Sequence, residues 1–336
     1  MNQSGAFTHP LNKALTKEGV PSMSSLSVFL SNYNHAKYVA QAIEAIVTQS
    51  RPPDEFIIID DASTDNSVEI IQEFAHRYHF IDFARNHRNM GALATAQKLL
   101  SKATGEYIYG AGADDYVLPG FFETAMAMAE QYPQAGVISG KVIVIDTNDN
   151  KIGVAEIPHW TTPRFASPRQ FLKDYLEKVA LDHSLSSATI YKRTSLEEVG
   201  GFRPGLRAWS DTFAIRAIGL RYGACYIPQP CTCFRLSPNS LTSSTIEDVR
   251  LMLKIIARCA DLMRSTQFNL YFPREYVVRW EQNYRSTIIH RNVGKLIIKE
   301  FGEDVWKRLY ALWSLFGASQ KKLNRLLFLL LKALSA

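Results

Sequence analysis

The adjacent acids Asp114 and Asp115 have the residue type and the position needed to hold a metal ion. Residues 107–109 favour a buried strand, and the small residues 110–113 leave room for a ligand to approach the backbone. The two acids therefore stand where that strand ends. In an open α/β sheet ligands bind outside the carboxyl ends of the strands, where two carboxylates supply hard oxygen ligands for a divalent cation. The alternative is an Asp-rich turn that caps a helix beginning near Gly120.

Three other aspartates begin or end expected elements. Asp60 and Asp61 follow residues 55–59, a nearly unbroken apolar run of the kind found in parallel strands covered on both faces. Asp211 opens residues 211–221, which have helical spacing, and an acid at that place is also typical of a helix N-cap. Together with the rest of the chain, these acids favour a functional site over a structural turn.

Strands and helices alternate along the part of the chain that carries most of these acids. We expect strands at residues 26–31, 55–59, 80–84, 107–109 and 137–145. We expect helices at residues 39–49, 66–78, 92–103 and 121–131. Alternation with short connections predicts an α/β fold with a mostly parallel, doubly wound sheet and right-handed crossovers.

The regular alternation weakens beyond residue 146. Residues 147–242 mix turns, short strands and short helices, and residues 243–336 are almost wholly helical in character. Residues 1–25 are polar and without periodicity, which predicts a flexible N-terminal arm. In residues 321–332 a narrow basic stripe faces a broad leucine surface. This helix is expected either to lie in the interface of an anionic membrane or to pack on neighbouring helices or on a second subunit, as in a homodimer.

The composition is that of an ordinary globular protein. With 336 residues, 46% of them hydrophobic, the chain can form a well-packed core. A net charge of +6, concentrated towards the C-terminus, does not indicate nucleic-acid binding. The four cysteines match neither zinc nor disulfide spacing, which predicts reduced thiols in a cytoplasmic protein. Because no signal peptide and no apolar stretch of about 20 residues is visible, we expect a cytoplasmic protein, with peripheral attachment to the inner face of the cytoplasmic membrane as the alternative.

Several motifs, taken in their order along the chain, resemble the inverting, nucleotide-sugar-dependent glycosyltransferases of family 2, whose fold is called GT-A. The matching stretches are residues 27–34, Gln49-Ser50, residues 55–65, residues 89–91, residues 105–108, Asp114-Asp115 with Pro119, and Gly200-Gly201-Phe202 followed by Asp211. The resemblance implies a GT-A domain at residues 26–242, with a nucleotide-binding half at 26–146 and an acceptor half at 147–242. It does not cover the C-terminal helical region, residues 243–336.

The resemblance also implies where a sugar nucleotide binds. Such a donor presents a base, a ribose and a diphosphate, so its site needs base-selective hydrogen bonds and a metal that neutralises charge. Ser31, Tyr33 and Asp61 are implied to form the base pocket, with Tyr33 against the ring and Asp61 accepting from a ring N–H. A strand-end aromatic and a helix cap are the structural alternatives for Tyr33 and Asp61. Arg88 or Arg85 is implied to approach the base or the diphosphate, unless both are merely solvated.

Catalytic and acceptor-side roles are implied for the remaining residues. Asp115 is expected to hold Mn²⁺ or Mg²⁺, and Asp114 to contact the ribose or the metal shell. Asp211 is expected to take the proton of the acceptor hydroxyl as that oxygen attacks the anomeric carbon opposite the leaving diphosphate. Asp182 and His183 are expected on the acceptor side, although a lone histidine can equally be structural.

The chain departs from the family pattern at three positions. Gly112 stands where many members have the first acid of Asp-x-Asp-Asp, and Ser210 stands where an acid usually precedes Asp211. Leu236 follows Arg235 in a stretch where a histidine is often found. These departures leave the ribose contact and the metal dependence open, and they make Arg235 a weak candidate for a phosphate contact.

The function expected from these residues is transfer of one sugar, with inversion, from a nucleoside diphosphate donor to a hydroxyl of a glycan or lipid-linked glycan in bacterial cell-surface polysaccharide synthesis. We expect a UDP-sugar as the donor. One alternative is a catalytically silent sugar-nucleotide-binding or scaffold protein of the same fold. A nucleotidyltransferase would need a Gly-rich, basic phosphate loop, which residues 32–35 are not. A dinucleotide-dependent dehydrogenase is disfavoured because no Gly-x-Gly-x-x-Gly follows a strand.

Overall fold

A ten-stranded sheet runs through the part of the protein that the computed structural model describes, residues 24–179, 185–237, 240, 242–243, 245 and 248–301. Its strands are β1 (Leu26–Asn32), β2 (Glu55–Asp60), β3 (Ile81–Arg85), β4 (Tyr107–Gly112), β5 (Tyr116–Val117), β6 (Val137–Ile145), β7 (Lys151–Ala155), β8 (Arg164–Ala166), β9 (Thr189–Lys192) and β10 (Ala224–Arg235). The α-helices are α1 (Val39–Val47), α2 (Ser67–Arg77), α3 (Ala92–Lys102), α4 (Phe121–Gln131), α5 (Pro168–Gln170), α6 (Arg193–Glu198), α7 (Ser210–Tyr222), α9 (Val249–Arg264) and α10 (Arg274–Phe301). A π-helical segment, Phe171–Leu176, and two 3₁₀ segments, Ser186–Ala188 and Pro204–Trp209, complete these elements.

The strands follow the order β3-β2-β1-β4-β9-β6-β10-β5, with β7 paired to β6 and β8 paired to β10. Strands β1 to β4 pair in parallel, and β6 pairs in parallel with β10. The expected α/β sheet is therefore confirmed. Its antiparallel pairs come from four short strands, β5, β7, β8 and β9, whose few residues carry little periodicity. Strand β9 lies between β4 and β6, so both halves of the expected domain contribute to one sheet.

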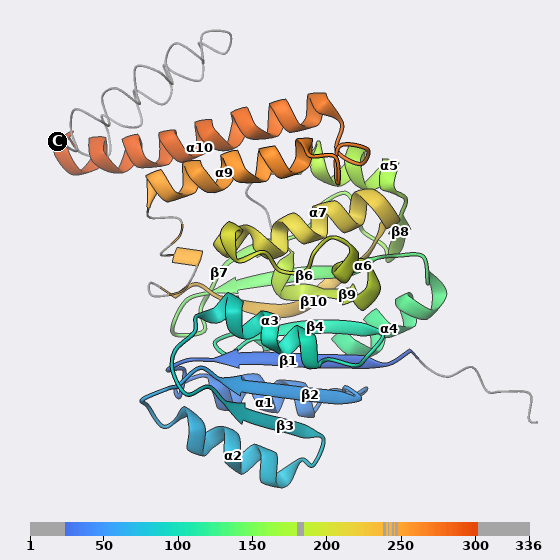
Figure 1. Ribbon diagram of the computed structural model, residues 1–336, viewed down its shortest axis with the longest axis vertical. Helices are drawn as coiled ribbons and strands as arrows, with labels where there is room; N and C mark the ends of the chain where they lie inside the picture. Colours follow the sequence, from blue (N-terminus) through green and yellow to red (C-terminus); the bar gives the residue numbers. More distant parts are fainter. Residues whose placement is uncertain are drawn as a thin grey trace, which may run out of the picture.

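The central strands are apolar because they are covered on both faces. In β2, Phe56, Ile57, Ile58 and Ile59 are all buried, as are Leu26, Val28 and Leu30 in β1. Successive side chains of a strand point to opposite faces of the sheet, so a strand with only one buried face would alternate apolar and polar residues. The unbroken apolar run at residues 56–59 is thus explained by helices on both sides of the sheet, as Figure 1 shows.

Helices α9 and α10 form a hairpin that covers α7, which itself covers the sheet (Figure 1). The aromatic ring of Phe213 in α7 contacts those of Phe268 and Phe272, which lie in the connection between α9 and α10. Among the described residues, none of the helices has both the length and the apolar character needed to cross a membrane. Residues 1–23 of the expected arm and the amphipathic stretch 321–332 lie outside the described residues.

The four cysteines, Cys225, Cys231, Cys233 and Cys259, are free and buried. Burial raises the pKa of the Cys225, Cys231 and Cys259 thiols to about 12. A thiol with so high a pKa contains almost no thiolate near neutral pH, and the thiolate is the nucleophile and the metal ligand. The expected structural role of these residues therefore agrees with their surroundings.

Helix α7 approaches the start of β6 closely because Gly136 has no side chain. A Cβ atom on Gly136 would lie 2.2 Å from Cγ2 of Ile218 and 3.1 Å from Cβ of Tyr222. Carbon atoms do not approach to 2.2 Å without a bond, so the glycine sets the distance between α7 and the sheet. Because α7 begins with Ser210 and Asp211, the same contact helps to set the position of Asp211.

We predict that Gly136→Ala lowers the free energy of unfolding by about 1–3 kcal/mol, the usual cost of overpacking a core. Urea denaturation measures this change. The Ile218→Ala background removes the Cγ2 atom that the new methyl group meets, so the same substitution should cost less there. An equal cost in both backgrounds would show that the Gly136–Ile218 contact is not the cause.

Candidate functional site

The Asp114–Asp115 turn follows directly from the end of β4. The backbone N–H of Asp115 donates to the carbonyl oxygen of Gly112 across 3.3 Å, which closes a tight turn. A Cβ atom on Gly112 would lie 2.9 Å from Oδ2 of Asp115 and 3.3 Å from Oδ1 of Asp114. The space that a side chain at position 112 would need is therefore taken by the two following carboxylates. The glycine at this position, where many members of the resembled family have an acid, leaves that space to the Asp114 and Asp115 carboxylates.

Among the described residues, the carboxylate of Asp115 accepts from one protein donor, through one of its two oxygens. Its Oδ1 accepts from the backbone N–H of Arg235 at 2.7 Å. Burial and the neighbouring Asp114 carboxylate raise the pKa of Asp115 well above its ordinary value, and Arg235 acts in the opposite direction. Two adjacent carboxylates, both partly buried, offer hard oxygen ligands to a cation.

The residues present fit a magnesium or manganese ion that is completed by its substrate. Among the described residues, no group of three or more His, Cys, Asp or Glu side chains could hold a metal ion. Mg²⁺ commonly binds through one or two carboxylates together with substrate phosphates and water, so the carboxylates of Asp114 and Asp115 meet that requirement. Most of the coordination would then come from the diphosphate.

Pairing in the sheet brings the expected base pocket next to this turn. Ser31, near the end of β1, stands opposite Gly112 of β4 on one side and opposite Ile59 of β2 on the other. Tyr33 follows two residues later, and its side chain is 43% exposed. An exposed aromatic ring at this edge is free to pack against a planar ligand. Ser31 and Tyr33 thus lie at the same edge of the sheet as the metal candidates.

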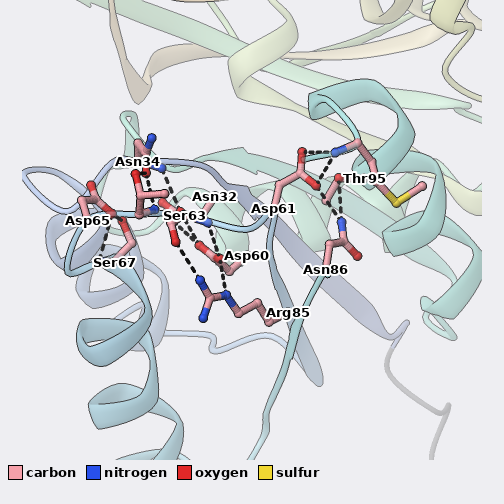
Figure 2. Close-up of polar contacts among 12 residues, drawn as sticks. Asn32, Asn34, Asp60, Asp61, Ser63, Asp65, Ser67, Arg85, Asn86 and Thr95 are labelled. Carbon is pink, nitrogen blue, oxygen red and sulfur yellow. Dashed lines mark hydrogen bonds and ion pairs between the residues drawn. The ribbon is translucent and has the colours of Figure 1, made fainter. Parts of the chain in front are cut away.

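Asp60 shapes the turn after β2 through buried hydrogen bonds (Figure 2). Its carboxylate accepts from Nδ2 of Asn32 at 2.8 Å, and from the backbone N–H and the hydroxyl of Ser63 at 2.9 and 2.5 Å. Nε of Arg85 lies 3.5 Å from Oδ1 of Asp60, and Nη2 of Arg85 donates to the carbonyl oxygen of Ser63. Arg85 is exposed but bonded to this turn, whereas Arg88 is exposed in the following loop.

Asp61 points to the other side and anchors the loop that precedes α3 (Figure 2). Its carboxylate accepts from Nδ2 of Asn86 at 2.8 Å and from the backbone N–H groups of Met90 and Gly91 at 2.9 and 2.8 Å. Nδ2 of Asn86 also donates to the hydroxyl of Thr95 at 3.2 Å. Asp61 is thus a buried anchor in this structure and does not cap a helix. The sequence carried no signal for Asn86, because an asparagine in a polar loop is unremarkable until its partner is known.

Asp211 lies at the second position of α7, which begins at Ser210. The N-cap alternative is therefore wrong, because the N-cap residue is Trp209 and Asp211 is already helical. Its Oδ1 accepts from the backbone N–H of Thr212 at 2.6 Å. Burial raises the pKa of Asp211, and hydrogen bonds from Ser186 and Thr212 oppose that rise. A carboxylate with a raised pKa is a stronger proton acceptor than one in water.

The 3₁₀ segment Ser186–Ala188 connects Asp211 to β4. Ser186 forms a hydrogen bond with Asp211, and the carbonyl oxygen of Ser187 accepts from the hydroxyl of Tyr109 at 2.7 Å. Tyr109 lies in β4, three residues before Gly112. One short segment therefore links the strand that carries the metal candidates to the proton acceptor. Asp182 and His183 lie outside the described residues.

Comparison with known proteins gives a consistent family and fold. The sequence model of the family described as glycosyl transferase family 2 matches residues 27–200 of this chain. Curated relatives match at 29–38% identity over 90–196 residues. One of them is the putative teichuronic acid biosynthesis glycosyltransferase TuaG of Bacillus subtilis. It is 32% identical over 27% of this chain and 36% of its own length. The chain matches only about a third to just over a half of the length of the first of these relatives.

Solved structures extend the likeness to most of the described fold. TarS 1–349 of S. aureus, solved in complex with UDP-GlcNAc, has a TM-score of 0.56 at 18% identity over 79% of this chain and 81% of its own. The mannosyltransferase PcManGT of Pyrobaculum calidifontis, solved with GDP-Man and Mn²⁺, has a TM-score of 0.57 at 16% identity over 94% of this chain and 87% of its own. The expected GT-A architecture is confirmed by these likenesses, which at such identities concern the fold alone.

Ala62, which directly follows Asp61 in the turn after β2, offers a test of backbone strain. Its φ of 64° lies in the left-handed region, which costs an L-residue about 1–2 kcal/mol. Glycine avoids that cost but loses about 0.5–1 kcal/mol more conformational entropy on folding. We predict that Ala62→Gly raises the free energy of unfolding by about 0.5–1 kcal/mol in urea denaturation, whereas Ala62→Val lowers it. A less stable glycine variant would contradict the assignment of strain.

Proposed function

Because the chain belongs to glycosyl transferase family 2, we propose that it is an inverting glycosyltransferase that uses a nucleoside diphosphate sugar. The donor we propose is a UDP-sugar, and the acceptor is a hydroxyl of a glycan or lipid-linked glycan in bacterial cell-surface polysaccharide synthesis. TarS was solved with UDP-GlcNAc, PcManGT with GDP-Man, and TuaG is named for teichuronic acid biosynthesis. These three proteins support the donor class and the setting.

One observation carries the proposal: a pair of carboxylates at the end of β4 stands beside the base-pocket candidates at the end of β1. A sugar nucleotide has the same layout, because its base lies at one end and the ribose joins that base to the charged diphosphate. We propose that Tyr33 packs on the base, that Ser31 and Asp61 hydrogen-bond to it, and that Asp114 contacts the ribose. Arg88 is proposed to approach the diphosphate from its exposed loop.

A divalent ion held by Asp115 would supply positive charge to the diphosphate and so make it a better leaving group. The PcManGT structure contains Mn²⁺, which supports Mn²⁺ or Mg²⁺ as the cofactor. The chain's own part is to hold the ion and to orient the donor. Asp211 then accepts the proton from the acceptor hydroxyl while the acceptor oxygen forms its bond to the anomeric carbon and the bond to the diphosphate breaks. A single displacement of this kind inverts the configuration.

Asp182 and His183 are proposed to face the acceptor, and residues 321–332, with their basic stripe and leucines, to attach the protein to an anionic membrane surface. The competing function is a silent sugar-nucleotide-binding protein. Hydrolysis of a UDP-sugar in the absence of acceptor, detected as free UDP, separates the enzyme from such a protein.

We predict that Asp115→Asn weakens Mn²⁺-dependent binding of UDP by about 100-fold or more, which corresponds to about 2.7 kcal/mol. The amide keeps an oxygen for the Arg235 N–H but removes the charge that holds the ion. Isothermal titration calorimetry with UDP and Mn²⁺ measures the change. Asp174→Asn, which removes a carboxylate paired with Lys178 on the π-helical segment, is the control and should bind as the wild type does. Unchanged binding by Asp115→Asn would refute the metal assignment.

We predict that Asp211→Asn lowers kcat by about two orders of magnitude or more while the affinity for the donor stays the same. Asparagine keeps the shape and the hydrogen bond to Thr212 but cannot take up the proton. In the wild type the base must be ionised, so kcat/KM should fall as pH decreases. Since burial raises the pKa of Asp211, the midpoint of that fall should lie above the value of about 3.9 for a free aspartate. Wild-type turnover by the variant, or an acid limb at the ordinary value, would exclude this role.

A further inference from the structure

Arg235, the last residue of β10, has no role in the proposed function. Its side chain is 0% exposed, which is rare for an arginine, and it lies directly behind the Asp114–Asp115 turn. Resting on the metal assignment of the proposed function, we propose that Arg235 is a positioning residue. It holds the Asp114–Asp115 turn in the shape that binds the ion and ties this turn to α1 and to the turn at residues 146–149.

Two contacts join Arg235 to the turn itself. Its backbone N–H donates to Oδ1 of Asp115 at 2.7 Å, and its Nε donates to the carbonyl oxygen of Asp114 at 2.8 Å. The first contact orients the Asp115 carboxylate so that Oδ2 accepts from none of the described protein donors. The second fixes the peptide that joins the two acids. One residue therefore controls both the side chain and the backbone of the metal candidates.

The far end of the guanidinium is bound to two other segments. Nη1 donates to the carbonyl oxygen of Asp146 at 3.1 Å, and Nη2 donates to Oδ1 of Asp149 at 2.7 Å and to Oε1 of Gln41 at 3.1 Å. The guanidinium carbon lies 4.3 Å from the ring centroid of Tyr38, at the start of α1. All three nitrogens are thus engaged by the protein. This arrangement argues against a phosphate contact, which needs donors directed at the ligand.

The rigid fork of the guanidinium explains why an arginine serves here. Its planar donors point in fixed directions, so three separate segments are held at set distances from one another. Its charge also offsets the mutual repulsion of the two carboxylates in front of it. A lysine would keep the charge and the backbone N–H but could not reach Asp114, Asp146, Asp149 and Gln41 together. Metal affinity should therefore depend on residues that never touch the ion.

Asp149 and Gln41 allow this dependence to be tested without disturbing the turn. Both are exposed, and each accepts from Nη2 of Arg235. Asp149 has a φ of 66°, which glycine tolerates, so Asp149→Gly removes the acceptor without adding backbone strain. Gln41→Ala removes the other acceptor from a helix surface. Lys178→Gln, which breaks the surface ion pair between Lys178 and Asp174 of the π-helical segment, is the matched control.

The experiment measures the Kd of Mn²⁺ by electron paramagnetic resonance at a saturating concentration of UDP, together with thermal unfolding of the same samples. Loss of a residue behind a metal ligand commonly costs 10–100-fold in metal affinity. We expect Arg235→Lys to weaken Mn²⁺ binding about 10-fold, the double variant Asp149→Gly with Gln41→Ala to weaken it measurably, and Lys178→Gln to leave it unchanged. The spectrum of the bound ion should also change in the first two variants.

The outcomes separate this inference from the proposed function. A lower melting temperature with an unchanged Kd and spectrum in the double variant would mean that Arg235 only stabilises the fold, and it would overturn the positioning role. Should Arg235→Lys not fold, the double variant alone decides. If the wild-type protein binds no Mn²⁺ in the presence of UDP, the metal assignment of the proposed function is wrong. The positioning role of Arg235, which rests on that assignment, is then wrong as well.

Discussion

Parallel pairing of β1 with β2 on one side and with β4 on the other is the constraint on which the rest of the site depends. Parallel strands end at the same edge of a sheet, so Ser31, Asp60 and Gly112 are brought together although they are far apart in the chain. The pairing is held in register by apolar residues buried on both faces of β1 and β2. A slip of one residue would turn these side chains to the opposite faces and move every acid at the edge. Core packing and site geometry are therefore consequences of one register.

Adjacent acids at this edge do different work because they point in different directions. Asp60 closes its own turn through Asn32 and Ser63, whereas Asp61 holds a loop some thirty residues away in sequence. Hydrogen bonds to charged groups each contribute about 1.5–3 kcal/mol. The bonds of both acids therefore offset the cost of burying their charge, and they stabilise the backbone around the site. Asp114 and Asp115 differ from them, since between the two carboxylates only one hydrogen bond from a described protein donor is made, to Oδ1 of Asp115.

Much of the fold could be predicted from the sequence, and the reasons are local. The apolar runs of β1 and β2 and the helical spacing of α1 and α2 each lie within a dozen residues, and they located the acids at strand ends correctly. A strand was expected close to β9, but its antiparallel place between β4 and β6 could not be assigned, because both neighbours are distant in sequence. The buried position of Arg235 escaped prediction for the same reason. Its partners Gln41 and Asp114 lie 194 and 121 residues away. The conflict between a side chain at position 112 and Asp115 likewise exists only in three dimensions.

The place of β9 in the sheet has a consequence for how the chain folds. Strand β4 finds one neighbour, β1, within the first part of the chain, but its other neighbour is not available until residues 189–192 have been made. Among the described strands, β6 pairs with β7, β9 and β10 and not with β4. Within residues 26–146, the edge of β4 that pairs with β9 in the folded protein therefore has no strand partner among the described strands. Contacts of such long sequence separation form late and slowly, and an uncovered strand edge is a place where chains associate wrongly. The strand that joins the two halves of the sheet is therefore also the step at which folding and aggregation compete.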